Sequence, residues 1–250
     1  MIQSFTKTGP ADQISWEVRG LGWLAAAAGA QVVQVVQWDA GKLVEERLHP
    51  TQTTTEMAEA FGRGLALTHA AGAKAFGIGP DGWDATEPGW VGRARLPLGD
   101  YRRWGEFYAE LRLLPHAHAA HAQGSLTKAD IDLVERVCQR LRDGEFDDGR
   151  PPARVHGDLW TGNVIPTARG MVMIDPAAHG GHGETDLAML ALFGCPQLRV
   201  VEDAYAEAAG LAPDWRSRSG LHQLHPLLVH TELFGSGYGR QAIEVAHAYA

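Results

Sequence analysis

Two carboxylates and one amide stand at spacings that can support phosphoryl transfer. Four residues separate Asp158 from Asn163, and Asp175 follows the apolar run Met171–Ile174. This reaction depends on positioning and charge neutralisation more than on a strong nucleophile. One carboxylate can accept a hydroxyl proton, while an amide oxygen and a second carboxylate can bind magnesium ions. The structural alternative is a polar loop in which Asp and Asn only cap turns, as these residues often do.

The elements predicted around these residues would bring them together. Ala153–Val155 is predicted to form a short strand that leads into the loop containing Asp158. Val164-Ile165 and Met171–Ile174 then predict a β-hairpin, with Gly170 at its turn. This loop and hairpin would place the carboxylates and the amide side by side. We favour chemistry over turn capping because these residues match an ordered pattern and not merely a composition.

The loop also matches an ordered pattern found in protein kinases. His156, Asp158 and Asn163 reproduce H-x-D-x-x-x-x-N, the pattern of the kinase catalytic loop. In that arrangement the Asp accepts the proton of the substrate hydroxyl, and the Asn and a further Asp hold the magnesium ions that bridge the nucleotide phosphates. The pattern therefore predicts Asp158 as the catalytic base, and Asn163 and Asp175 as ligands of the metal and thereby of the nucleotide.

The wider segment makes the resemblance more specific. Residues 156–164 read HGDLWTGNV, which closely resembles the HGDLWSGN signature of the fructosamine (ketosamine) kinase family, within the aminoglycoside/choline phosphotransferase-like kinases. Leu159-Trp160, followed by a hydroxyl residue and Gly162, is the narrower mark of this family. The resemblance extends over nearly the whole chain and is weakest in residues 72–99.

The resemblance implies an α+β, two-lobed protein-kinase-like fold. Residues 1–49 would form a small, strand-rich and N-terminally shortened lobe that binds the nucleotide, and residues 50–250 a mostly helical lobe with the catalytic loop and substrate site. It also implies ATP and Mg²⁺ as cofactors, and phosphorylation of a sugar hydroxyl of ketosamines on small amines or proteins, a route to deglycation. Two alternatives stay open. One is a kinase for another small hydroxyl compound, such as an aminoglycoside or a choline-like amino alcohol, and the other is a non-catalytic nucleotide-binding or scaffold protein.

A lysine and a glutamate near the N-terminus complete the predicted nucleotide site. Ser4–Lys7 alternates and predicts a strand, and apolar residues of segment 14–24 then repeat at helical spacing until Gly29. With the resemblance, Lys7 and Glu17 match the kinase ion pair in which the lysine contacts the phosphates. A solvated lysine and a glutamate in a first helical turn would be the simpler interpretation. The catalytic-loop pattern favours the ion pair, so we expect Lys7 and Glu17 to bind the nucleotide.

The position of Lys7 also predicts a missing element. Kinase-like small lobes begin with two strands joined by a loop that covers the phosphates, and the lysine strand comes third. Because Lys7 is so close to residue 1, we expect this cover to be absent, ATP affinity to be weak and turnover to be slow. We also expect the sheet edge at Ser4–Lys7 to be exposed or to pair with a second copy of the chain in a homodimer.

Other segments carry structural predictions. Residues 32–38 and 43–48 are predicted to form one hairpin, and Thr53 with Glu56 a capping box for the next helix. Residues 72–99 are dense in Gly, Pro, Asp and Trp and predict an irregular loop that either shapes substrate entry or covers the core.

The later part of the chain adds two expectations. An aromatic helix is predicted over Trp104–Leu113, before Pro115. The resemblance to related kinases implies that Asp186 supports the catalytic loop by hydrogen bonding.

Composition excludes several other classes of protein. With 250 residues and 45% hydrophobic residues, the chain can build a real core, and its net charge of −8 argues against nucleic-acid or anionic-membrane partners. No apolar run approaches the roughly 20 residues of a membrane span, and the start MIQSFTK does not resemble a signal peptide. Cys138 and Cys195 suggest neither a disulfide framework nor a zinc site. We therefore expect a cytoplasmic protein.

Overall fold

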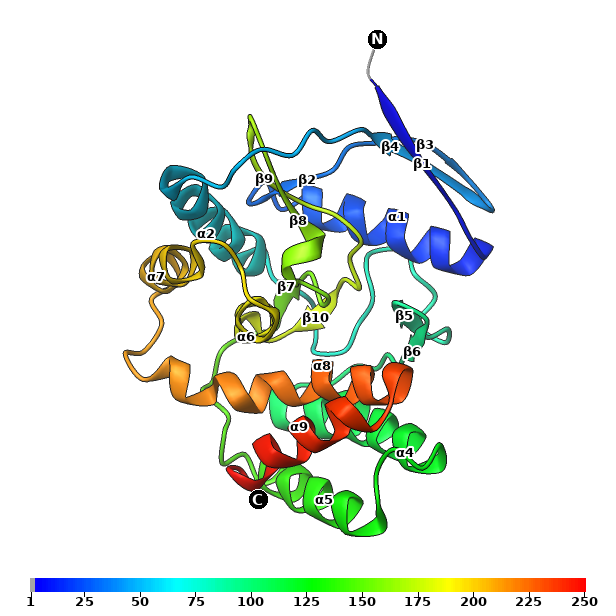
Figure 1. Cartoon of the computed structure of the whole chain (residues 1–250), viewed down its shortest axis with the longest axis vertical. Coiled ribbons are helices and arrows are strands. Elements are labelled where there is room, and N and C mark those ends of the chain that lie inside the picture. Colours follow the sequence, from blue (N-terminus) through cyan, green and yellow to red (C-terminus); the bar gives the residue numbers. More distant parts are fainter. Residues whose placement is uncertain (1–2) are drawn as a thin grey trace.

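The structure is a computed structural model that describes residues 3–250. Strands predominate in its first part and near the catalytic loop, and helices elsewhere, which confirms the predicted α+β class (Figure 1). Within the described residues, no helix is both long and apolar enough to cross a membrane.

The first sheet carries Lys7 and has the strand order β1–β4–β3. Its antiparallel strands are β1 (Ser4–Thr8), β3 (Val35–Asp39) and β4 (Lys42–Glu46). Helix α1 (Ala11–Ala25) packs beside this sheet and buries Ile14 and Leu21 against Leu43. The helix ends before Gly29, contrary to the prediction, because a turn follows in which Ala28 adopts a positive φ of 52°.

The segment predicted as one strand over residues 32–38 is divided between two sheets. β2 (Gln31–Val32) pairs in parallel with β9 (Gly170–Met173), whereas β3 pairs with β4. The single-strand prediction was wrong because an apolar run does not reveal that its two ends join different partners. β8 (Val164–Thr167) completes the second sheet, in the order β2–β9–β8, and the predicted β8–β9 hairpin is confirmed. The expected division of the chain at residue 49 stays a prediction.

Two further strand pairs flank the site. β7 (Ala153–Val155) pairs antiparallel with β10 (His179–Gly181). β5 (Gly89–Val91) and β6 (Ala94–Leu96) form a hairpin inside the segment that was predicted to be irregular, so that prediction was wrong for these residues. The hairpin approaches α1 closely, since a Cβ on Gly89 would lie 2.5 Å from the ring of Trp16.

The helices form two groups (Figure 1). On one side α2 packs against α7, and at the opposite end α4, α5, α8 and α9 surround a core of Leu and aromatic side chains, with α6 contacting α7 and α8. Their bounds are α2 (Thr55–Ala70), α4 (Leu114–Ala122), α5 (Lys128–Arg142), α6 (Gly183–Phe193), α7 (Leu198–Ala209), α8 (Ser219–Phe234) and α9 (Ser236–His247). Short 3₁₀ turns occupy Thr161–Asn163 and Trp215–Arg218.

Two helix boundaries differ from their predictions. The hydroxyl of Thr54, and not of Thr53, accepts a hydrogen bond from the Met57 amide and caps α2, so the predicted capping box was one residue out of register. The aromatic helix does not stop before Pro115. It runs from α3 (Trp104–Phe107) through a π-helical stretch, Tyr108–Leu113, into α4. Pro115 lies at the start of α4, directly after the π-helical stretch, where the helical hydrogen-bond pattern changes.

Candidate active site

The loop after β7 has a backbone shape that only glycine can adopt at its second position. Gly157 has a φ of +80°, and a Cβ there would lie 2.3 Å from the carbonyl oxygen of Ala177. His156 fixes the next turn: its Nε2 donates to the Ile174 carbonyl at 2.8 Å, and its Nδ1 accepts from the Asp158 amide at 3.2 Å. The loop is therefore attached to the β9 side before it reaches Asp158.

Behind the loop, Asp186 of α6 provides the support that the resemblance implied. Its two carboxylate oxygens accept the amides of His156 at 2.7 Å and Gly157 at 3.0 Å. His69 of α2 bridges Asp186 to Tyr205, with Nε2 at 3.0 Å from Asp186 and Nδ1 at 2.7 Å from the tyrosine hydroxyl. Burial alone would raise the pKa of Asp186, but the hydrogen bonds and charges of its partners hold that pKa below its usual value of 3.8.

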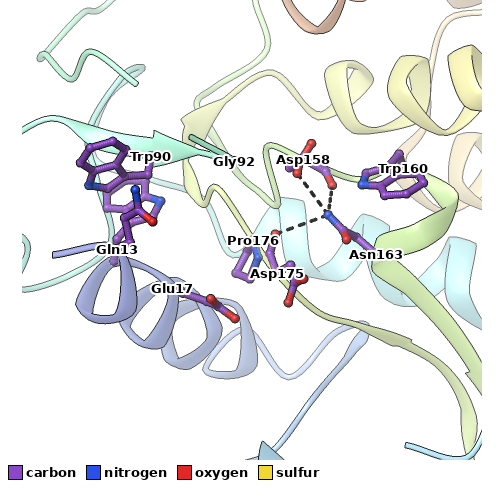
Figure 2. A pocket seen from close by; sticks show the side chains of 10 residues that line it. Gln13, Glu17, Trp90, Gly92, Asp158, Trp160, Asn163, Asp175 and Pro176 are labelled. Carbon is purple, nitrogen blue, oxygen red and sulfur yellow. Dashed lines mark hydrogen bonds between the residues drawn. The ribbon is translucent and has the colours of Figure 1, made fainter. Parts of the chain in front are cut away.

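In front of the loop, the three residues predicted for metal and proton chemistry lie together (Figure 2). Asn163 Nδ2 lies 2.9 Å from the backbone oxygen of Asp158, 3.2 Å from its carboxylate and 3.5 Å from the backbone oxygen of Asp175. Since Nδ2 is the donor in each contact, the side-chain oxygen of Asn163 is available as a ligand.

The electrostatics of Asp158 differ from those of an ordinary surface carboxylate. Burial raises the pKa of Asp158 to about 7; the hydrogen bond from Asn163 opposes this shift, and the charges of Asp175 and Asp186 add to it. A carboxylate with such a pKa is well matched to proton transfer near neutral pH.

Asp175 occupies a strained backbone position at the end of the hairpin. Its φ is +53°, in the left-handed region that is uncommon for a residue other than glycine, and Pro176 follows it. The carboxylate is 44% exposed, so it is accessible from the cavity described below. Strain of this kind clusters at functional sites, where the surrounding structure maintains it.

Lys7 contacts two further carboxylates in addition to its predicted partner Glu17. Its Nζ is 2.6 Å from Glu17 and 3.2 Å from Glu45, and it also contacts Asp175. Burial would lower the pKa of Lys7, but the three acids together raise it above its usual value of 10.5. Burial raises the pKa of Glu17 to about 7, and it also raises the pKa of Glu45. The predicted Lys7–Glu17 contact is present.

Glu45 is a site residue that sequence reasoning missed. Its side chain is only 3% exposed, and its Oε1 has no hydrogen-bond partner in the described part of the chain. Leu43 and Glu45 are both buried on β4, and β1 sets Lys7 opposite Leu43. Strand alternation puts Glu45 on the same buried face as Leu43, and that period was the signal available in the sequence.

A cavity of about 340 Å³ opens between α1, the β5–β6 hairpin and the catalytic loop. Its lining residues are Gln13, Trp16, Glu17, Trp90, Gly92, Asp158, Trp160, Asn163, Asp175 and Pro176. Figure 2 shows Trp90 and Gln13 on one side, and Asp158, Trp160 and Asn163 on the other. Trp90 and Gly92 come from the segment predicted to be irregular, so that segment does border the site.

The structure also explains why Gly162 of the HGDLWTGN segment is a glycine. A Cβ on Gly162 would lie 2.2 Å from the ring of Trp160. The ring therefore packs directly over this glycine, and any larger residue would displace it. Trp160 remains 40% exposed at the edge of the cavity.

Comparisons with known proteins agree with this geometry. A sequence profile of the family described as fructosamine kinase matches residues 4–249. A probable ketoamine kinase of Vibrio parahaemolyticus is 33% identical over 183 residues, which are 73% of this chain and 59% of that protein. The chain therefore spans less than two thirds of the length of this relative.

Solved structures extend the comparison to the fold. A structure from Thermobifida fusca, whose name assigns it to fructosamine-3-kinase, is 46% identical with a TM-score of 0.90, covering 98% of this chain and 85% of that one. A choline kinase of Streptococcus pneumoniae has a TM-score of 0.64 at 13% identity, covering 99% of this chain and 87% of that one. At that identity the likeness concerns the fold alone, and it places the chain among the kinase-like folds.

Proposed function

Because the chain belongs to the fructosamine kinase family, we propose that it transfers the terminal phosphoryl group of ATP to a sugar hydroxyl of a ketosamine. One observation carries this proposal. The carboxylate of Asp158, the amide of Asn163 and the carboxylate of Asp175 border one cavity, and Lys7 contacts Asp175. The product would be a phosphorylated sugar–amine adduct, and the biological role would be deglycation.

Asp158 is the proposed base. Its carboxylate lies at the cavity and receives a hydrogen bond from Asn163 at 3.2 Å, which fixes its orientation. An acceptor hydroxyl within hydrogen-bonding distance of Asp158 would give up its proton as the oxygen–phosphorus bond forms. The amides held by Asp186 prevent the loop from moving away from this position.

The residues of the site fit the cofactors that the family implies. The side-chain oxygen of Asn163 and the exposed carboxylate of Asp175 are the oxygen donors that Mg²⁺ prefers. When bound, Mg²⁺ would neutralise charge on the nucleotide phosphates. Lys7, held by Glu17 and Glu45, would direct its ammonium group toward the same phosphates.

A substrate panel with labelled ATP tests the function. We expect transfer to a ketosamine such as fructosyl-lysine, and loss of transfer in Asp158→Asn. Transfer to an aminoglycoside or an amino alcohol but not to any ketosamine would support the first alternative. Absence of detectable nucleotide binding in calorimetry would favour the second alternative in its scaffold form.

The metal role of Asp175 has a separate test. Asp175→Ala should weaken magnesium-dependent ATP binding as well as catalysis, because the phosphates lose a counter-charge. Isothermal titration with and without Mg²⁺ measures this effect. Unchanged, magnesium-dependent affinity in the variant would contradict the assignment.

Self-association through the first sheet also stays a prediction. The order β1–β4–β3 places β1 at an edge, and Phe5 on this strand is exposed. Light scattering of the purified protein over a range of concentrations would detect a homodimer.

A further inference from the structure

Aromatic side chains continue from the catalytic loop across the helical part of the protein. The ring of Trp160 lies 6.4 Å from that of Phe193, which lies 4.9 Å from that of His230. His230 in turn lies 5.4 Å from Phe234 and 5.0 Å from Tyr238. We call these five residues the aromatic strip. They come from the catalytic loop, the end of α6, the end of α8 and the start of α9.

The strip is accessible at both ends and uncharged along its length. Trp160 is 40% exposed and Phe234 is 61% exposed. His230 donates its Nδ1 proton to the Pro226 carbonyl at 2.7 Å, and burial lowers the pKa of His230, so the ring is neutral at pH 7. Phe193, His230 and Tyr238 are half-buried and connect the two exposed rings. Single exposed apolar residues are normal on protein surfaces, but a connected, partly exposed aromatic surface of this kind marks a binding site.

The position of Trp160 determines what can cover this strip. Trp160 and Asp158 border the same cavity, and the reacting hydroxyl must approach Asp158. A ketosamine is a sugar joined to an amine, so the remainder of the acceptor leaves the cavity while the hydroxyl stays at Asp158. The strip begins at the edge of that cavity. Its occupant is therefore the group that is covalently attached to the reacting sugar.

We propose that the aromatic strip binds the amine substituent of the ketosamine and selects substrates in which this substituent is aromatic or apolar. The inference rests on the proposed function and specifies its substrate class. An aromatic substituent can stack on or meet the edges of these rings, with favourable interaction beyond simple burial of area. A small hydrophilic substituent would gain nothing from them.

Two substrates that share a sugar distinguish binding at the aromatic strip from the phosphoryl transfer step. Ketosamines of fructose with benzylamine and with glycine differ only in the substituent. In Phe234→Ser, the KM for the benzylamine compound should rise about tenfold, as expected for loss of one aromatic contact. Its kcat and both constants for the glycine compound should stay unchanged, because Phe234 does not line the cavity that contains Asp158. Phe234→Tyr should restore the low KM.

A matched control excludes a general effect of a surface change. Leu67 is 60% exposed and belongs to α2, a helix that Figure 1 shows away from the end of α8. Leu67→Ser should leave the constants for both substrates unchanged. Equal changes for the two substrates in Phe234→Ser, or no change for either, would overturn the proposal.

Failure of the proposed function is a separate outcome. A wild-type protein that phosphorylates neither compound contradicts the assignment as a ketosamine kinase and not the strip itself. Calorimetric titration of the benzylamine ketosamine then tests whether the aromatic strip binds the substituent, with about tenfold weaker binding expected in Phe234→Ser. Equal affinity of the wild type and this variant would overturn the proposal in that case as well.

Discussion

The two sides of the catalytic loop carry carboxylates with opposite electrostatics. Asp158 faces the cavity and its pKa is raised to about 7, whereas Asp186 lies behind the loop and its pKa is held below 3.8. Burial pushes both values upward. The difference arises from their partners, because Asp186 accepts two backbone amides and contacts His69, while the carboxylate of Asp158 receives a hydrogen bond from Asn163.

The contrast separates a structural carboxylate from a reactive one. Hydrogen bonds to the charged form make Asp186 a stable anion that holds the loop. Few hydrogen bonds and two neighbouring acids leave Asp158 poised to accept a proton. Substitutions on the two sides should therefore separate catalysis from stability.

Asp158→Asn should give the largest effect. We expect the rate of phosphoryl transfer to fall by about 10²–10⁴-fold, as for removal of a general base. The free energy of unfolding should not fall, because a poorly compensated buried charge is removed. Steady-state kinetics and urea unfolding measure the two effects. A rate close to that of the wild type would contradict the role of Asp158. A loss of stability would show that Asp158, like Asp186, stabilises the fold.

Asp186→Asn should mainly affect stability. An amide group cannot accept both loop amides, so we expect the free energy of unfolding to fall by about 3 kcal/mol. Asp203→Asn is the control, because Asp203 is 56% exposed and pairs with arginines at the surface. That control should change stability by less than about 0.5 kcal/mol. Equal effects of both substitutions would contradict the supporting role of Asp186.

The pH dependence of stability should identify Asp186 independently. Its folded pKa lies below its usual value of 3.8, so the stabilisation is complete above about pH 4. It is lost as the pH falls below the usual value and through the folded pKa, because over this range the unfolded state takes up the proton more readily than the folded state. The stability gap between the wild type and Asp186→Asn should therefore narrow below pH 4. A gap that is constant from pH 7 to pH 3 would show that the charge of Asp186 is unimportant.

Tyr205→Phe tests the hydrogen bond between Tyr205 and His69, the residue that contacts Asp186 behind the loop. This substitution should have the smallest effect. It removes the hydroxyl that lies 2.7 Å from His69 Nδ1, and we expect a loss of about 1 kcal/mol in unfolding free energy. Tyr249→Phe deletes an exposed hydrogen bond to the Ser217 carbonyl at 3.0 Å and serves as the control. We expect little change in the control, and the kcat of Tyr205→Phe should stay near that of the wild type.

Local sequence predicted the reactive side of the loop well. Asp158, Asn163 and Asp175 are joined by one loop and one hairpin, and turn and strand preferences over this short segment are enough to bring them together. The short strand and the helix that carry Lys7 and Glu17 were likewise predicted from periodicity, and their contact is present. The roles of these residues in catalysis and nucleotide binding stay predictions.

The contacts behind Asp186 and the β5–β6 hairpin beside the cavity could be predicted less well. The resemblance implied that Asp186 holds the loop, but the bridge from His69 to Tyr205 spans 136 residues and carries no local pattern. The β5–β6 hairpin was hidden in a segment rich in Gly, Pro and Trp. Its position depends on packing against Trp16 and not on its own preferences.

The sequence by itself determined which residues could do chemistry and how the loop and hairpin present them, because spacing and turn propensity act over a few residues. Only the tertiary structure decided what surrounds them. Lys7 contacts Asp175, which lies 168 residues later in the chain, and has Glu45 as a further partner. Burial in this cluster raises the pKa of both Glu17 and Glu45. Burial and long-range contacts arise when separate elements pack together, so one local segment cannot specify them.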